Sequence, residues 1–134
     1  MAATLTMTLP LELLSDDDLM NLRDEADRLL EARNTASLPG KVLEAVKDVL
    51  AEDEPDAPAP VSAEFTTREW EDGFFWNDGN PTVTLVDGST RTLDLSGRHR
   101  DLDGALTDHS GWIEPNDNST LLVTFEPLAL EPCI

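Results

Sequence analysis

The stretch TVTLVDGSTRTLDL, residues 82–95, constrains the fold most strongly, because it combines strand-like alternation with a turn signal. Apolar and polar residues alternate on both sides of Asp87-Gly88, which is typical of two half-buried antiparallel strands. A two-residue turn would place the apolar residues of the two strands on opposite faces. A three-residue turn, Val86 to Gly88 with Gly88 in the left-handed conformation, avoids this mismatch. It places four apolar residues on one face: Val83, Leu85, Leu93 and Leu95.

Further patterns on both sides of this hairpin predict more strands and a short helix. Residues 73–77 are rich in aromatic side chains, and residues 121–125 alternate apolar with polar ones. Between them, Asp101 is placed to cap a short helix. Residues 128–134 show no strand pattern and are expected to be a loose tail. Residues 62–134 are therefore predicted to form an antiparallel β-meander with one short inserted helix.

The N-terminal part of the chain has the periodicity of amphipathic helices. Ser15 followed by three aspartates is a typical helix start, because the hydroxyl caps the first turn and the carboxylates lie near the positive end of the helix dipole. Apolar residues recur at steps of three and four to about Arg33, and again from Pro39 to about Glu52. The break between these runs predicts a helical hairpin over residues 1–52.

Both predicted helices need a surface to cover their apolar stripes. They can lie on the sheet, pair with a second copy of the chain, or bind another molecule. The candidate interface residues are Leu19, Leu22, Leu29, Val42, Val46 and Val49.

Residues 53–61, DEPDAPAPV, combine like charge with three prolines. This composition favours extended polyproline geometry and disfavours a packed core. The predicted organisation is therefore α+β, with a helical hairpin over residues 1–52, an acidic Pro-rich linker over 53–61 and a β-rich domain over 62–134.

The chain is strongly acidic, with a formal net charge of −19 spread evenly along it. Residues 1–62 carry −9 and residues 63–134 carry −10. Direct binding to nucleic acid or to an anionic membrane needs a basic surface, so the charge argues against both. Two interpretations stay open: a bias towards solubility or salt tolerance, and an acidic surface that binds a basic partner or mimics nucleic acid.

Cysteine content and the N-terminal sequence bear on where the protein is located. Cys133 is the single cysteine, so no intrachain disulfide forms. No basic residue precedes Arg23, and no apolar run reaches membrane-spanning length. We expect a soluble cytoplasmic protein.

One cluster of residues has the composition of a catalytic or metal site. Imidazole and carboxylate side chains are the usual ligands of zinc and iron, and they gather at His99, Asp101, Asp103, Asp108 and His109. Their spacing matches neither HExxH nor an EF-hand. The favoured interpretation is a solvated loop and a helix cap, with no metal, no cofactor and no catalytic residue; a hydrolase or metalloenzyme centred on this cluster is the weakest alternative.

Aromatic and acidic side chains concentrate in one segment. The aromatic residues are first of all candidates for the core. Strand alternation, however, turns Phe75 away from Phe74 and Trp76, so part of the aromatic surface stays exposed unless helices cover it. An aromatic edge rimmed by acids suits a basic partner. The candidate binding residues are Glu69, Trp70, Glu71, Asp72, Phe75, Trp76 and Asp78.

These observations favour a non-catalytic interaction protein that engages a basic protein surface, with nucleic-acid-binding proteins as one class of such partners. The alternative is a structural or assembly component that forms homo-oligomers or docks through its N-terminal helices. Salt discriminates between the two, because electrostatic recognition weakens with ionic strength whereas a buried apolar stripe does not.

Overall fold

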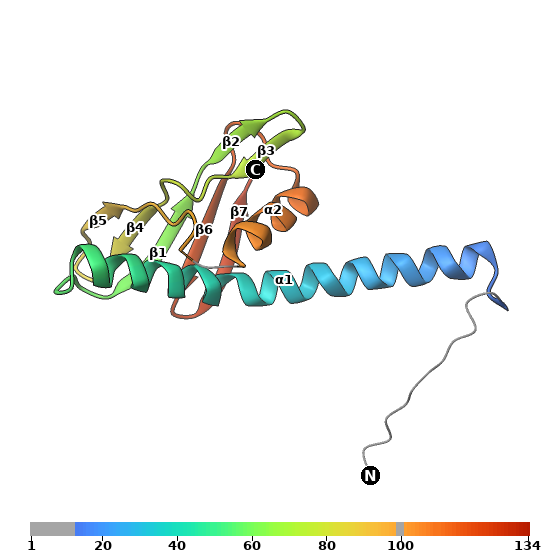
Figure 1. Ribbon diagram of the computed structural model, residues 1–134, viewed down its shortest axis with the longest axis horizontal. Coiled ribbons are helices and arrows are strands. Elements are labelled where there is room, and N and C mark those ends of the chain that lie inside the picture. Colours follow the sequence, from blue (N-terminus) through green and yellow to red (C-terminus); the bar gives the residue numbers. More distant parts are fainter. Residues whose placement is uncertain (1–12, 99–100) are drawn as a thin grey trace, which may run out of the picture. The chain divides into compact units, whose positions relative to one another are not determined.

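The computed structural model describes residues 13–98 and 101–134 and confirms the predicted α+β class (Figure 1). A long N-terminal helix precedes antiparallel strands and one short helix. The chain divides into two compact units, Met1–Leu30 and Glu31–Ile134.

The long helix α1 (Asp16–Asp53) begins where the sequence predicts, because the Asp18 backbone N–H donates to Ser15 Oγ at 3.2 Å. The prediction of two helices is wrong, since α1 continues through residues 34–37 and includes Pro39. Proline in a helix interior costs about 3 kcal/mol. Tertiary contacts offset this cost: Leu38 and Pro39 are buried, and Asn34 Nδ2 donates to the Ala105 carbonyl at 3.2 Å.

Within the described residues, five antiparallel strands form the main sheet: β1 (Pro60–Phe65), β4 (Thr82–Leu85), β5 (Thr90–Thr92), β6 (Thr120–Phe125) and β7 (Leu128–Cys133). Their order is β5-β4-β1-β6-β7, so β1 lies at the centre rather than at the start of a simple meander. The expected loose tail is wrong, because β7 pairs with β6 along its whole length. No side chain of this edge strand is buried, so the strand lacks the alternation of buried and exposed residues by which strands are predicted.

A second, two-stranded sheet consists of β2 (Thr67–Trp70) and β3 (Gly73–Trp76). The short helix α2 (Leu102–Ile113) contacts β3, and Figure 1 shows it beside this hairpin. Leu102, Ala105 and Leu106 of α2 are buried, as the sequence predicts. This hairpin and α2 together position the candidate site.

The three-residue turn between β4 and β5 is confirmed. Val83 pairs with Arg91, and Gly88 has a φ of 86°. The Gly88 N–H donates to the Leu85 carbonyl at 2.9 Å, and the Leu85 N–H donates to the Ser89 carbonyl at 2.8 Å. All four apolar residues that the sequence assigns to one face are buried: Val83, Leu85, Leu93 and Leu95.

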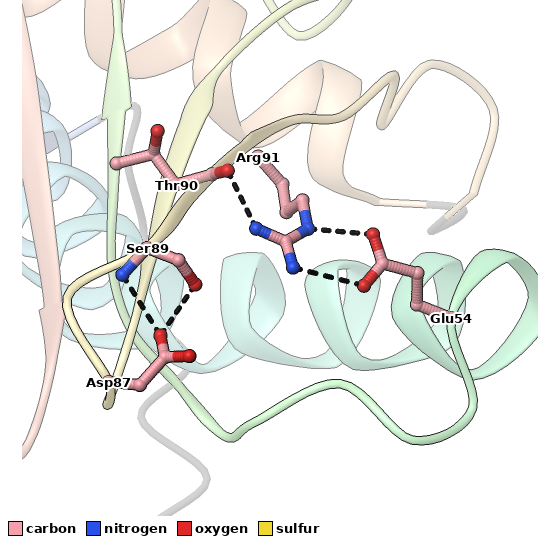
Figure 2. Close-up of polar contacts among 5 residues, drawn as sticks. All are labelled: Glu54, Asp87, Ser89, Thr90 and Arg91. Carbon is pink, nitrogen blue, oxygen red and sulfur yellow. Dashed lines mark hydrogen bonds and ion pairs between the residues drawn. The ribbon is translucent and has the colours of Figure 1, made fainter.

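Polar contacts join this hairpin to the end of α1 (Figure 2). Arg91 binds Glu54 with two hydrogen bonds, Nε to Oε1 at 2.6 Å and Nη2 to Oε2 at 3.1 Å. The hydrogen bond from Arg91 lowers the pKa of Glu54. In the turn, Asp87 Oδ1 accepts hydrogen bonds from the backbone and the hydroxyl of Ser89.

The C-terminal half of α1 and the main sheet share one hydrophobic core. Of the candidate helix-interface residues, Val42, Val46 and Val49 belong to this core. Residues 53–61 lie within the unit Glu31–Ile134, and the Ala59 carbonyl accepts a hydrogen bond from the Val86 N–H at 2.8 Å. The predicted domain boundary in this segment stays a prediction. In the described part of the chain, no helix has an apolar stretch that would span a bilayer.

Candidate binding pocket

A pocket of about 580 Å³ opens between the β2–β3 hairpin, the segment that follows β3, and α2. Its walls combine aromatic and carboxylate side chains. The lining residues are Arg68, Trp70, Glu71, Asp72, Phe75, Trp76, Asn77, Asp78, Asp103 and Thr107.

The register of the β2–β3 hairpin leaves one indole uncovered. Arg68 pairs with Phe75, and Trp70 pairs with Gly73, so Arg68, Trp70 and Phe75 share a face. Because Gly73 has no side chain to cover its neighbour, Trp70 remains 54% exposed. Gly73 also has a φ of 132°, which only glycine adopts readily.

The Trp70 ring already contacts a cation from its own chain. The guanidinium carbon of Arg68 lies 4.8 Å from the ring centroid. This distance is within the range of cation–π interactions, in which the negative face of the ring attracts positive charge. The rim of the pocket is therefore chemically suited to a guanidinium or ammonium group.

Trp76 forms a fixed inner wall of the pocket. Its indole Nε1 donates to His109 Nδ1 at 2.9 Å, and its backbone N–H donates to Ser110 Oγ at 3.0 Å. Ser110 Oγ in turn donates to the Leu106 carbonyl at 2.8 Å. Since His109 Nδ1 accepts a hydrogen bond, this nitrogen carries no proton, and burial lowers the pKa of the imidazole.

Two carboxyl groups of the pocket lining, those of Asp78 and Asp103, lie close enough to interact directly. Burial, together with the hydrogen bond and the negative charge of Asp103, raises the pKa of Asp78 to about 6. Ser96 Oγ lies 3.4 Å from Asp78 Oδ1 and partly opposes this rise. A cation bound between Asp78 and Asp103 would relieve their repulsion and favour the charged form of both.

The structure brings most of the sequence-predicted binding residues to this pocket. Six of them line it: Trp70, Glu71, Asp72, Phe75, Trp76 and Asp78. Glu69, which pairs with Phe74, does not line it.

Sequence reasoning missed Arg68, Asn77, Asp103 and Thr107 as pocket residues. The i, i+2 spacing of Arg68 and Trp70 on a strand carried a usable signal, since such residues share a face. Asp103 could not be found this way, because the contact between α2 and the hairpin depends on the tertiary fold.

The described members of the histidine and aspartate cluster lie in different surroundings. His99 lies outside the described residues, Asp103 lines the pocket, and His109 is engaged by Trp76. Across residues 13–98 and 101–134, no three His, Cys, Asp or Glu side chains are grouped to hold a metal ion.

Comparison of the chain with protein-family models, curated proteins and solved structures found no match. The chemistry of the pocket and the charge of the chain are therefore the basis for a functional proposal.

Proposed function

We propose that this protein is a non-catalytic interaction protein whose pocket binds a basic side chain on the surface of a protein partner. The observation that carries the proposal is the exposed Trp70 indole, beside a pocket rich in carboxylates. Among the described residues that line the pocket, four are acidic and one is basic: Glu71, Asp72, Asp78, Asp103 and Arg68.

Arginine suits this pocket better than lysine. A guanidinium is planar, stacks on an aromatic face and donates hydrogen bonds to two carboxylates in a fixed geometry. The contact between Arg68 and Trp70 provides an example of this stacking in the same molecule. An incoming arginine would use Trp70 and Phe75 for stacking and the carboxylates of Asp78 and Asp103 for hydrogen bonds.

The free energies of the individual contacts indicate that a single bound arginine side chain gives only modest affinity. A cation–π contact at an exposed site contributes about 0.5–1 kcal/mol, and an exposed ion pair contributes about 0.2–1 kcal/mol. The net charge of −19 adds long-range attraction, which speeds association with a basic surface and weakens with salt. The partner is therefore expected to present several basic residues.

A nucleic-acid-binding protein is one class of basic partner, and the evenly spread acids of this chain would then mimic phosphates. This form of the proposal is supported by charge alone. Its test is a comparison of two competitors: DNA should release such a partner at a lower concentration than heparin, because any basic protein binds a polyanion through charge alone.

Calorimetric titration with an acetylated, arginine-rich peptide tests the pocket. Trp70→Ala should weaken binding by roughly two- to fivefold, which corresponds to the loss of about 0.5–1 kcal/mol. Asp103→Asn should weaken binding and reduce its salt dependence.

Asp48→Asn is the matched control, because Asp48 is exposed on α1 and does not line the pocket, although the change in net charge is the same. If Asp48→Asn weakens binding as much as Asp103→Asn, the peptide responds only to net charge. If Trp70→Ala binds as tightly as the unmodified protein, the pocket is not the binding site.

A further inference from the structure

The N-terminal half of α1 has an uncovered leucine stripe. Leu19 is 38% exposed, Leu22 is 39% exposed and Leu29 is 57% exposed. With Ala26 they follow one another at steps of three, four and three residues. This spacing matches the a and d positions of two consecutive heptads, which is the pattern of a coiled-coil seam.

We propose that residues 16–30 form a parallel, in-register, two-stranded coiled coil with a second copy of this chain. In the seam, Leu19 and Ala26 occupy a positions, and Leu22 and Leu29 occupy d positions. This interaction surface is independent of the pocket and does not rest on the proposed pocket function.

Charges beside the seam favour the parallel orientation. Asp18 precedes the first a position and Arg23 follows the first d position, so they occupy g and e positions. In a parallel pair, a g residue faces the e residue five positions further along the other helix. Asp18 then faces the second copy's Arg23, and the symmetry of the dimer repeats this attractive contact on the other side.

The antiparallel orientation brings like charges together. Aligning Leu19 with the second copy's Leu29 keeps all four seam layers. In that alignment Glu25 faces Glu25 of the second copy, and Arg23 faces Arg23 of the second copy. Like charges in such positions are destabilising, whereas opposite charges specify partner and orientation. A second copy arranged in parallel is therefore the occupant that fits this surface.

Residues 16–30 are already helical in the single chain, which allows a seam of only two heptads to pair. An isolated helix of about 15 residues is marginal in water, since helix nucleation is unfavourable. Here residues 16–30 belong to one helix that continues to Asp53 and is buried over its C-terminal part. Pairing therefore needs no separate nucleation step. A two-stranded coiled coil uses a narrow seam of a and d positions, which Leu19, Leu22, Ala26 and Leu29 fill here, while Leu30 is an exposed apolar residue at the neighbouring e position.

Sedimentation equilibrium of the full chain over a range of concentrations tests the proposal. The mass should rise from that of one 14.7 kDa chain to twice this value. Leu22→Glu should raise the dimer dissociation constant at least tenfold.

Met20→Glu is the matched control, because Met20 is also exposed but lies at a b position, outside the seam and its flanking e and g positions. It should change the constant by less than twofold. A protein that stays monomeric, or a Met20→Glu variant that dissociates as readily as Leu22→Glu, would overturn the proposal. Tryptophan fluorescence of each variant confirms that the unit Glu31–Ile134 stays folded, since all three tryptophans lie there.

A charge exchange tests the orientation. Asp18→Arg alone places like charges at the Asp18–Arg23 contact and should weaken the dimer. Adding Arg23→Asp to the same chain recreates opposite charges in a parallel pair and should restore dimerisation, although the unfavourable arginine near the helix start remains. If the double variant is as weak as Asp18→Arg, the two helices are not parallel and in register.

Discussion

Trp76 and His109 form a buried pair in which the indole Nε1 donates to the imidazole Nδ1 at 2.9 Å. This contact needs an unprotonated nitrogen, and burial lowers the pKa of His109 below its ordinary value of 6.5. The unfolded chain therefore binds a proton at His109 at a higher pH than the folded chain. Stability contributed by this residue is complete above about pH 6.5 and falls as the pH drops towards the folded-state pKa.

Two substitutions separate the hydrogen bond of His109 from its titration. His109→Asn keeps an acceptor for Trp76 and should remove the loss of stability that begins below pH 6.5. His109→Leu leaves the buried indole N–H unsatisfied and should lower the free energy of unfolding by about 1–3 kcal/mol at pH 8. Urea unfolding at pH 5 and pH 8 measures both. An Asn variant that keeps the full pH dependence would show that another group titrates.

Asp78 has the opposite pH effect, because its pKa is raised to about 6 by burial and by Asp103. The folded chain binds this proton more tightly than the unfolded chain, so stability contributed by Asp78 is present below the ordinary value of 3.8 and is lost as pH rises to about 6. Asp78→Asn should therefore stabilise the protein at pH 7. Since Asp78 is partly exposed, solvent screening reduces the expected gain to about 1 kcal/mol. A destabilised Asn variant in urea unfolding at pH 7 would contradict this assignment.

At the scale of single elements, the β4–β5 turn at Gly88 allows the most specific prediction for a substitution. A Cβ at Gly88 would meet no atom within 4 Å, so the effect of a substitution comes from the backbone φ of 86° alone. Gly88→Val should lower the free energy of unfolding by about 1–2 kcal/mol, because β-branched residues avoid this conformation.

Gly104→Ala is the matched control for Gly88→Val, since Gly104 also has nothing within 4 Å but lies in α2 at a helical φ. It should stabilise the protein by up to about 1 kcal/mol. Chemical denaturation of both variants measures the change in the free energy of unfolding. Opposite signs for the two variants would show that the backbone conformation, rather than the loss of glycine, decides whether the substitution stabilises or destabilises the protein.

Local patterns predicted some elements and not others, for physical reasons. The β4–β5 register followed from strand alternation, because the four buried residues can share one face only if the turn has an odd number of residues, and three is the shorter common hairpin length. The helix break expected near Asn34 and Pro39 did not form, since Asn34 binds α2 and Leu38 is buried. Both contacts involve residues far away in the sequence, so the residues around Asn34 do not reveal them. The β6–β7 pairing was missed because a strand at a sheet edge needs no apolar alternation.

At the scale of the whole molecule, the extent of the folding unit can be tested with two fragments. The helix side chains in the core are Leu38, Val42, Ala45, Val46, Val49 and Leu50. Burial of each larger apolar side chain contributes about 1.5–3 kcal/mol, so their sum is comparable with the net stability of a domain. Fragment 31–134 should therefore unfold cooperatively, and fragment 62–134 should not. Cooperative unfolding of 62–134 would support a domain boundary at residues 53–61.

The candidate pocket was accessible to sequence reasoning only in part. The high density of aromatic and acidic residues in one segment identified Trp70, Phe75 and Asp78 as candidate binding residues, because such a cluster is recognisable in the sequence alone. Trp70 pairs with Gly73, which has no side chain to cover the indole, and Asp78 owes its raised pKa to burial and then to Asp103 on α2. Both features depend on pairing and packing.

The most direct test of the pocket is an NMR titration of the tryptophan indole N–H signals with the arginine-rich peptide. The chain has three tryptophans, which makes three such signals. Trp70 and Trp76 line the pocket, whereas Trp112 does not. We expect the Trp70 signal to move most, the Trp76 signal to move less because its N–H stays bonded to His109, and the Trp112 signal to stay in place. Saturable binding that moves Trp112 as much as Trp70, or leaves Trp70 unmoved, would contradict the proposed function.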